Sequence, residues 1–253
     1  MSDFARQYVN EIGIDSEGLS KRELSAYPYA LFPSLLTSRL NITAPVTFFV
    51  GDNGSGKSTL LEAVAVFMGF NPEGGTRNFR FSTYDSHSPL AKHLYVNRGV
   101  RKPTDGFFLR AESFYNTATY IASLDDAGGL GAPVIGSYGG VSLHEKSHGE
   151  SFLSVIINRF GGNGLYLLDE PESALSFVGQ LSLLRVMRDL ARDGASQFIV
   201  ATHSPILTRL PDADIFQFAN GEIEKREYED TDITRLYRAF FASDKMLRET
   251  LED

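Results

Sequence analysis

The sequence has 253 residues and contains neither cysteine nor tryptophan. Without cysteine the chain has no disulfide, no thiolate metal site and no cysteine nucleophile, and this absence fits a reducing compartment. No apolar stretch approaches the roughly 20 residues that a membrane span needs. The N-terminal residues also lack the apolar segment of a secretory signal. We therefore expect a cytoplasmic protein that does not insert into a membrane.

Positive charge is also in short supply. The chain has 24 lysine and arginine residues against 32 aspartate and glutamate residues, which gives a formal net charge of -8. The negative net charge therefore gives no support to a nucleic-acid partner, although it does not exclude a local basic patch. The densest basic cluster is Arg98–Lys102, for which a solvated loop is the simpler interpretation.

What the sequence does have is an alternation of short apolar runs with helical patterns. Strands are expected at Val46–Val50, Phe107–Leu109, Leu165–Leu168 and Phe198–Ala201, helices at Ser58–Phe67, Gly149–Phe160 and Val178–Arg192, and a hairpin at residues 215–228. The stretch 124–140, rich in Gly and Asp, predicts a loop. Strands alternating with helices predict an α/β fold with a mainly parallel central sheet, to which the hairpin adds an antiparallel edge.

The segment Gly51–Thr59 has the pattern G-x-x-x-x-G-K-S between a predicted strand and a predicted helix. Its glycines let successive backbone N–H groups turn inward around a phosphate, and the N-terminus of the following helix adds its positive end. Lys57 then reaches the β- and γ-phosphates, and the Ser58 hydroxyl is a Mg²⁺ ligand. The candidate phosphate-binding residues are Asn53, Gly54, Ser55, Gly56, Lys57, Ser58 and Thr59.

Two acids, Asp169 and Glu170, directly follow the apolar run Leu165–Leu168. A carboxylate at the end of a buried strand is costly without a cation partner, so we expect Asp169 to serve Mg²⁺ and its shell of water. Glu170 would face the attacking water as its general base. The alternative is a pair of acids that only begins a loop.

His203 directly follows the predicted strand Phe198–Ala201. A side chain at the carboxyl end of a strand in such a sheet points at the crevice where ligands bind. His203 is therefore expected to hydrogen-bond the γ-phosphate and to orient the water, although a lone histidine is more often structural. Further upstream, Ser147 and Glu150 have the spacing of a capping box, and a capped helix N-terminus is itself an anion site.

The order of these motifs resembles that of the ATP-binding-cassette (ABC) ATPases. In that comparison Walker A is Gly51–Thr59, the signature is Ser147–Glu150, Walker B is Leu165–Glu170, the D-loop is Ser173–Ser176, and the switch histidine is His203. More closely, the segments S-H-G-E-S-F-L, L-L-D-E-P-E-S-A-L-S and A-T-H-S-P-I-L look like a family of small soluble bacterial ATPases, often labelled AAA-family, whose cellular role is unassigned.

The resemblance implies that ATP is bound and hydrolysed by an ATP-dependent homodimer. In ABC ATPases two domains pack head to tail, so the signature residues Ser147, Gly149 and Glu150 of one copy would close over the ATP held by the other. Hydrolysis would separate the pair and drive a protein partner that the sequence does not name. The resemblance also implies one domain, 1–253, with a nucleotide-binding core at 1–106 and 161–253 and a helical signature lobe at about 107–160.

The chain departs from the usual transporter pattern at three places. His148 and Glu150 stand where glycine and glutamine are usual, and no glutamine occurs between Ser58 and Ser147 to serve as the Q-loop residue. Glu112 is the candidate replacement near Mg²⁺, with a surface salt bridge as the alternative. The adenine contact is left open among Tyr27, Tyr29 and Phe32, for which core packing is the alternative.

Four functions compete. The first, which we favour, is an ATPase that dimerises on ATP and drives a partner. The second is the ATPase subunit of a membrane transporter, against which stand the altered signature and the missing glutamine. A third is a DNA-repair or chromosome-associated ATPase, but such proteins insert a long coiled coil where this chain has only about 90 residues without sustained heptads. The last is an ATP sensor without turnover, against which Glu170 argues.

Overall fold

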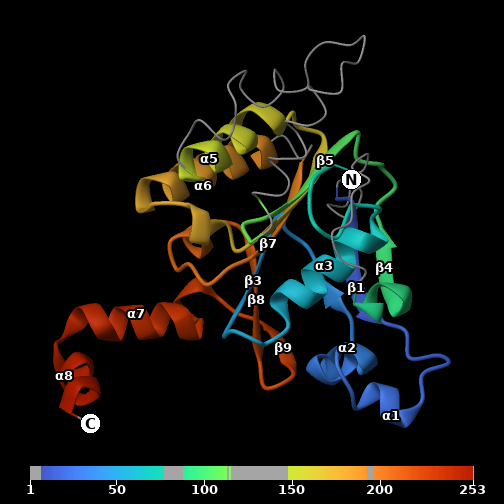
Figure 1. The fold of residues 1–253 in the computed structure, drawn as a ribbon, viewed down its shortest axis with the longest axis horizontal. Coiled ribbons are helices and arrows are strands. Elements are labelled where there is room, and N and C mark those ends of the chain that lie inside the picture. The colour runs from blue at the N-terminus through green and yellow to red at the C-terminus, as the bar shows by residue number, and fades with distance from the viewer. Residues whose placement is uncertain (1–6, 77–87, 113, 115–147, 193–195, 253) are drawn as a thin grey trace.

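The computed structural model describes residues 7–76, 88–112, 114, 148–192 and 196–252, and its larger sheet has the strand order β5-β6-β7-β3-β8-β9 (Figure 1). These strands are β3 (Val46–Gly51), β5 (Asp105–Arg110), β6 (Gly164–Asp169), β7 (Gln197–Ala201), β8 (Asp214–Ala219) and β9 (Glu222–Lys225). All neighbouring pairs are parallel except β8 with β9, which is antiparallel. The predicted fold class, a mainly parallel α/β sheet with an antiparallel edge, is confirmed.

Both faces of this sheet are buried, because side chains along each strand alternate between two hydrophobic clusters. In β3, Phe49 packs into the cluster that includes Leu60 of α3 (Lys57–Phe67). Its neighbour Phe48 packs into the other cluster, with Phe152 and Leu183. Those two residues belong to α5 (His148–Arg159) and α6 (Phe177–Arg192). The continuous apolar runs therefore form strands that are covered on both sides.

A second, three-stranded sheet has the order β2-β1-β4 and was not predicted. Its strands are β1 (Val9–Ile14), β2 (Leu40–Asn41) and β4 (Leu94–Arg98), and the short helices α1 (Lys21–Leu24) and α2 (Pro33–Thr37) lie between β1 and β2 in the chain. β1 pairs antiparallel with both neighbours. The basic cluster that begins at Arg98 continues from β4 into an exposed connection, as expected for solvated charge.

The last two helices, α7 (Asp232–Ala242) and α8 (Lys245–Glu252), extend away from the sheets and end at the C-terminus (Figure 1). We call them the C-terminal arm. The arm was not predicted from the sequence. None of the helices in the described ranges combines the length and apolarity that crossing a bilayer requires.

The expected division of the chain into a core and a signature lobe stays a prediction, but its first boundary needs a different position. β5 pairs with β6 along its whole length, from Asp105 with Gly164 to Arg110 with Asp169. Residues 107–110 therefore lie in the central sheet together with residues 105 and 106. Any boundary drawn near residue 106 has to move beyond the end of β5.

Candidate functional site

The segment Gly51–Thr59 connects the end of β3 to the start of α3 as a tight loop. Gly51 has a φ of 144° and Gly56 a φ of 102°, conformations that favour glycine. A Cβ at Gly51 would clash with the carbonyl oxygen of Phe218, and one at Gly56 would lie 2.7 Å from the ring of Phe32. The loop thus depends on glycine at these two positions, because β8 and Phe32 press against it.

Lys57 is held inside its own loop. Its side chain is buried, and Nζ donates hydrogen bonds to the carbonyl oxygens of Gly51 at 2.8 Å and Asp52 at 2.9 Å. Burial lowers the pKa of Lys57, while Glu170 and Asp169 act in the opposite direction. The ammonium group therefore lies at the N-terminus of α3, within the field of two carboxylates, where a phosphate would also bind.

Asp169 ends β6 in a buried position, only 6% exposed. Its register partner on β5 is Arg110, whose Nε lies 3.4 Å from Asp169 Oδ2. The other carboxylate oxygen, Oδ1, is buried and has no hydrogen-bond partner. Burial raises the pKa of Asp169 to about 6, against the lowering effects of Arg110 and the Ser58 hydroxyl. One oxygen thus faces a cation of the protein, and the second is left without any partner.

Glu170 and His203 meet at the ends of neighbouring strands. The Glu170 N–H donates to the carbonyl of Ala201 at 2.9 Å, and Glu170 has a φ of 48°, which turns the chain sharply after β6. Its Oε1 lies 3.3 Å from Nε2 of His203. Both side chains are partly exposed, at 42% and 29%. The His203 Nε2 atom itself is buried and has no hydrogen-bond partner among the described residues.

Glu172 fixes the position of the His203 backbone. Its Oε1 accepts a hydrogen bond from the His203 N–H at 2.5 Å, and its Oε2 is buried without a hydrogen-bond partner. Burial raises the pKa of Glu172, while the His203 N–H and the side chain of Thr202 lower it. Glu172 thus connects the turn Pro171–Ala174, which follows β6, to the segment that carries His203.

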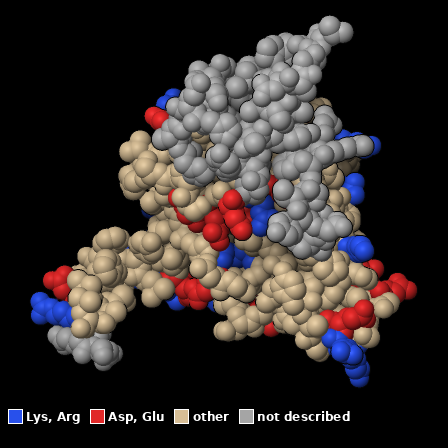
Figure 2. Space-filling view, in the orientation of Figure 1, with Lys and Arg blue, Asp and Glu red and all other residues tan. Residues whose placement is uncertain are grey.

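A cavity of about 320 Å³ brings several predicted residues together. It is lined by Ser58, Ala111, Glu112, Asp169, Glu170 and Ser173. Glu112 lies at the cavity with its side chain 88% exposed, and its Oε2 is 3.8 Å from Arg110. Figure 2 shows acidic and basic side chains side by side near the centre of the molecular face. The loop, the strand-end acids and Glu112 therefore share one pocket.

The described residues of the segment 147–150 do not line that cavity. Ser147 falls outside the described residues. Gly149 and Glu150 are in the first turn of α5, which packs against α6 and against the turn Pro171–Ala174. A Cβ at Gly149 would lie 2.9 Å from the carbonyl oxygen of Ala174. No α5 residue in the described part of the chain lines the cavity.

The remaining aromatic candidates divide by burial. Tyr29 and Phe32 are buried in the core cluster beside α3, in agreement with core packing, whereas Tyr27 is exposed.

Two residues of the site, Arg110 and Glu172, were not predicted from the sequence. Arg110 had a usable signal, because it directly follows the predicted strand Phe107–Leu109, at the same sheet edge as Asp169. Glu172 had none, since its bond to the His203 N–H joins segments 31 residues apart.

Two family models match the chain. One is described as an AAA domain and matches residues 32–105. The description of the other names an AAA domain, the AbiEii toxin and a Type IV TA system, and it matches residues 135–209. The first range contains the loop 51–59. The second contains residues 147–150, the two acids at 169 and 170, and the histidine at 203.

Two curated relatives are ATP-binding proteins of Rhodopseudomonas palustris. The chain is 29% identical over 163 residues to the cytochrome c biogenesis ATP-binding export protein CcmA of strain BisB5. The matched region covers 62% of this chain and 77% of CcmA. It is 27% identical over 191 residues to the hemin import ATP-binding protein HmuV of strain HaA2. The matched region covers 63% of this chain and 66% of HmuV.

Among solved structures, an ATP-binding cassette of an ABC transporter in its ADP conformation matches with a TM-score of 0.51 at 16% identity. The match covers 91% of this chain and 98% of that one. At this identity the likeness concerns the fold, and it agrees with the α/β architecture described above.

Proposed function

From the premise that the chain is an ABC-type P-loop ATPase, we propose that it hydrolyses ATP with Mg²⁺ between two copies packed head to tail. We further propose that the cycle of closing and opening drives a protein partner. The observation that carries the proposal is the meeting of Lys57, Asp169, Glu170 and His203 at one edge of the sheet. The cysteine-free composition supports a cytoplasmic location.

The loop Gly51–Thr59 is the proposed phosphate site. On ATP binding, Lys57 Nζ exchanges its two carbonyl partners for phosphate oxygens, which form stronger, charge-assisted hydrogen bonds. The Ser55 hydroxyl is buried without a hydrogen-bond partner and supplies a further donor. The N-terminus of α3 adds its positive end. These groups hold the phosphates in position before any chemistry takes place.

The residues beside the loop fit a divalent cation. Asp169 Oδ1 is buried and unpartnered, and it lines the same cavity as Ser58. Mg²⁺ is commonly held by one or two carboxylates together with substrate phosphates and water, and Asp169 and Ser58 provide a carboxylate and a hydroxyl beside the phosphate loop. When bound, Mg²⁺ neutralises charge that develops on the β- and γ-phosphates.

Glu170 and His203 are the proposed catalytic residues. Glu170 acts as the general base that accepts a proton from the attacking water. His203 Nε2, which lies 3.3 Å from Glu170 Oε1, orients that water and contacts the γ-phosphate. Glu172 is proposed as a positioning residue, because its carboxylate accepts a hydrogen bond from the backbone N–H of His203.

One copy supplies only half of this site. Gly149 and Glu150 do not line the cavity that holds Ser58 and Asp169, which supports a signature that acts on the ATP of a second copy. Ser147, Gly149 and Glu150 of that copy would then close the site and exclude water. ATP held between two surfaces joins the copies, and its hydrolysis releases them.

A second candidate, the ATPase subunit of a membrane transporter, is favoured by the printed names of the export and import relatives. The region that would contact membrane subunits lacks glutamine, however, and instead carries Arg110, paired with Glu62 and Asp169, and the exposed Glu112. We therefore rank the transporter below an ATPase with a partner of another kind.

The test is the Glu170→Gln variant with ATP and Mg²⁺. Removing the general base should lower hydrolysis about 10²–10⁴-fold while ATP binding is kept, so the closed dimer accumulates. Size-exclusion chromatography with light scattering should report a dimer with ATP and a monomer without it. Lys57→Ala on the same background is the control, since it should weaken ATP binding and abolish the dimer. A Glu170→Gln variant that binds ATP and stays monomeric would exclude the head-to-tail model.

A further inference from the structure

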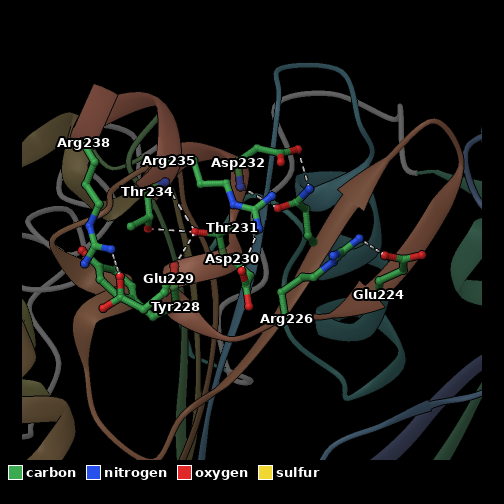
Figure 3. A network of polar contacts seen from close by, with 11 residues as sticks. Glu224, Arg226, Tyr228, Glu229, Asp230, Thr231, Asp232, Thr234, Arg235 and Arg238 are labelled. Atoms are coloured by element: carbon green, nitrogen blue, oxygen red, sulfur yellow. Dashed lines mark hydrogen bonds and ion pairs between the residues drawn. The ribbon is translucent and has the colours of Figure 1, made fainter. Parts of the chain in front are cut away.

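Arginine side chains form ion pairs in two different settings in this chain. At the base of the C-terminal arm, Arg235 pairs with Asp230 at 2.7 Å and Arg238 pairs with Glu229 (Figure 3). All four side chains are about half exposed, between 49% and 59%. Water and salt screen exposed pairs of this kind, so each contributes little to the stability of the fold.

Arg110, the last residue of β5, is in the other setting. Its side chain is only 19% exposed, and it contacts partners on three different segments. Nη1 donates hydrogen bonds to Glu62 Oε2 at 2.8 Å and to the carbonyl oxygen of Pro72 at 3.2 Å, while Nε lies 3.4 Å from Asp169 Oδ2. Because the guanidinium presents its N–H groups in a rigid planar fork, one arginine can hold several partners in fixed relative positions.

The two carboxylates that Arg110 joins lie on the elements that carry the candidate Mg²⁺ ligands. Glu62 follows Ser58 by four residues on α3, so the two side chains project from the same face of the helix. Asp169 ends β6 and lines the same cavity as Ser58. Arg110 does not itself line this cavity. Any effect of Arg110 on the cavity must therefore pass through its partners.

The charges around Arg110 are not balanced. One guanidinium faces Glu62, Asp169 and, at 3.8 Å, the exposed Glu112, which leaves an excess of negative charge. Arg110 Nε and Asp169 Oδ1 are both buried without a hydrogen-bond partner. Asp169 thus has one oxygen beside the guanidinium, and its second oxygen remains for a further cation.

We propose that Arg110 is a positioning residue for Mg²⁺, because it spans from α3 to the end of β6 and so fixes Asp169 relative to Ser58. The inference rests on the proposed function, since it gives Arg110 a part in the Mg²⁺ site of that function. Side chains that bind a metal are commonly oriented by further partners, and loss of such a partner costs about 10–100-fold in metal affinity or activity. Arg110 contacts Asp169 as a partner of this kind would.

The test compares ATP binding with and without Mg²⁺. The ratio of the ATP dissociation constant in EDTA to that in saturating Mg²⁺ measures how strongly the bound ATP engages the ion. Calorimetry is carried out in a parent that carries Glu170→Gln and Ser147→Arg, in which ATP is not hydrolysed and the proposed dimer does not close. In this parent, Arg110→Met should lower the ratio about 10–100-fold.

Arg159→Met is the matched control. Arg159 pairs with Asp105 at 2.7 Å with its side chain 24% exposed, and Asp105 begins the strand that Arg110 ends. The control therefore removes a comparably buried arginine from an ion pair at the opposite end of β5. It should also lower the stability in urea, but it should leave the Mg²⁺ ratio unchanged.

A second variant, Glu62→Ala, tests the span without altering Arg110 or Asp169. It removes the carboxylate that anchors the guanidinium on α3, so it should lower the Mg²⁺ ratio as well. Adding Glu62→Ala to Arg110→Met should lower the ratio no further, since two residues of one link do not act independently. Losses that add would contradict the span. Glu62→Ala alone tests the inference if Arg110→Met does not fold.

The outcomes separate this inference from the proposed function. An unchanged ratio in Arg110→Met would leave a purely structural ion pair, and a raised ratio would mean that the guanidinium competes with Mg²⁺ for Asp169. Either result overturns the inference while the Mg²⁺ site stands. A parent whose ATP affinity does not respond to Mg²⁺ would overturn the Mg²⁺ site and the role of Arg110 together.

Discussion

The ATP-binding edge of the sheet and the C-terminal arm both carry groups without suitable partners in the single chain, but the groups are of opposite polarity. At the edge, polar atoms are buried without full partners, as Asp169 Oδ1 and the Ser55 hydroxyl are. On the arm, apolar side chains such as Phe241 and Leu251 are exposed to water. Each arrangement is costly for an isolated chain. In both regions, a polar atom buried without a partner or an apolar side chain exposed to water indicates where a second molecule contacts the chain.

The sharpest contrast should come from two phenylalanines in opposite settings. Phe108 lies in β5 with its side chain fully buried, so Phe108→Ala should cost about 3–5 kcal/mol of unfolding free energy. Phe241 is exposed on the arm, so Phe241→Ala should change the stability of the monomer by less than about 0.5 kcal/mol. Urea denaturation at a dilution that keeps the chain monomeric measures both. Similar losses would mean that the arm packs on its own body in solution.

A smaller effect is expected at the ATP-binding edge from the pKa of Asp169, which burial raises from 3.8 to about 6. Between these values the native state binds the proton more tightly than the unfolded chain does. The contribution of Asp169 to stability is therefore favourable at low pH, is lost as the pH rises through this window, and stays low above it. The ionised carboxylate at neutral pH is thus a cost to the ligand-free fold.

Asp169→Asn removes that cost, since asparagine is neutral at every pH. The variant should be more stable than the parent by about 1–3 kcal/mol near pH 7.5 in the absence of nucleotide and Mg²⁺, and the difference should vanish near pH 4. Thermal or urea unfolding across this range in EDTA checks the sign. A variant that is less stable at pH 7.5 would mean that the bond to Arg110 outweighs the burial of the charge.

The two regions also differed in how far the sequence predicted them. β3, β6 and β7 were predictable because a strand buried on both faces needs a continuous apolar run, and the residues at its carboxyl end then fall at the ligand edge. Asp169, Glu170 and His203 could be proposed on that ground. Arg110 was within reach of the same argument, whereas the bond from Glu172 to the His203 N–H depends on tertiary structure alone.

The arm and the small sheet escaped prediction for a different physical reason. β1 and β4 are short strands whose partners lie far away in the sequence, so local pattern gives little warning of their pairing. α7 and α8 have amphipathic sequences, but their apolar faces point to solvent in the single chain. A pattern of that kind predicts a helix without identifying the surface that covers it.

The central claim is that each ATP site is built from two copies of the chain, and complementation tests it most directly. Lys57→Ala removes the phosphate ligand and leaves the signature intact, whereas Ser147→Arg blocks the signature and leaves the phosphate loop intact. Each variant alone should be inactive. A dimer that contains one copy of each variant has one intact composite site, so the mixture should recover part of the parental ATPase activity. A mixture no more active than its two components would contradict the account.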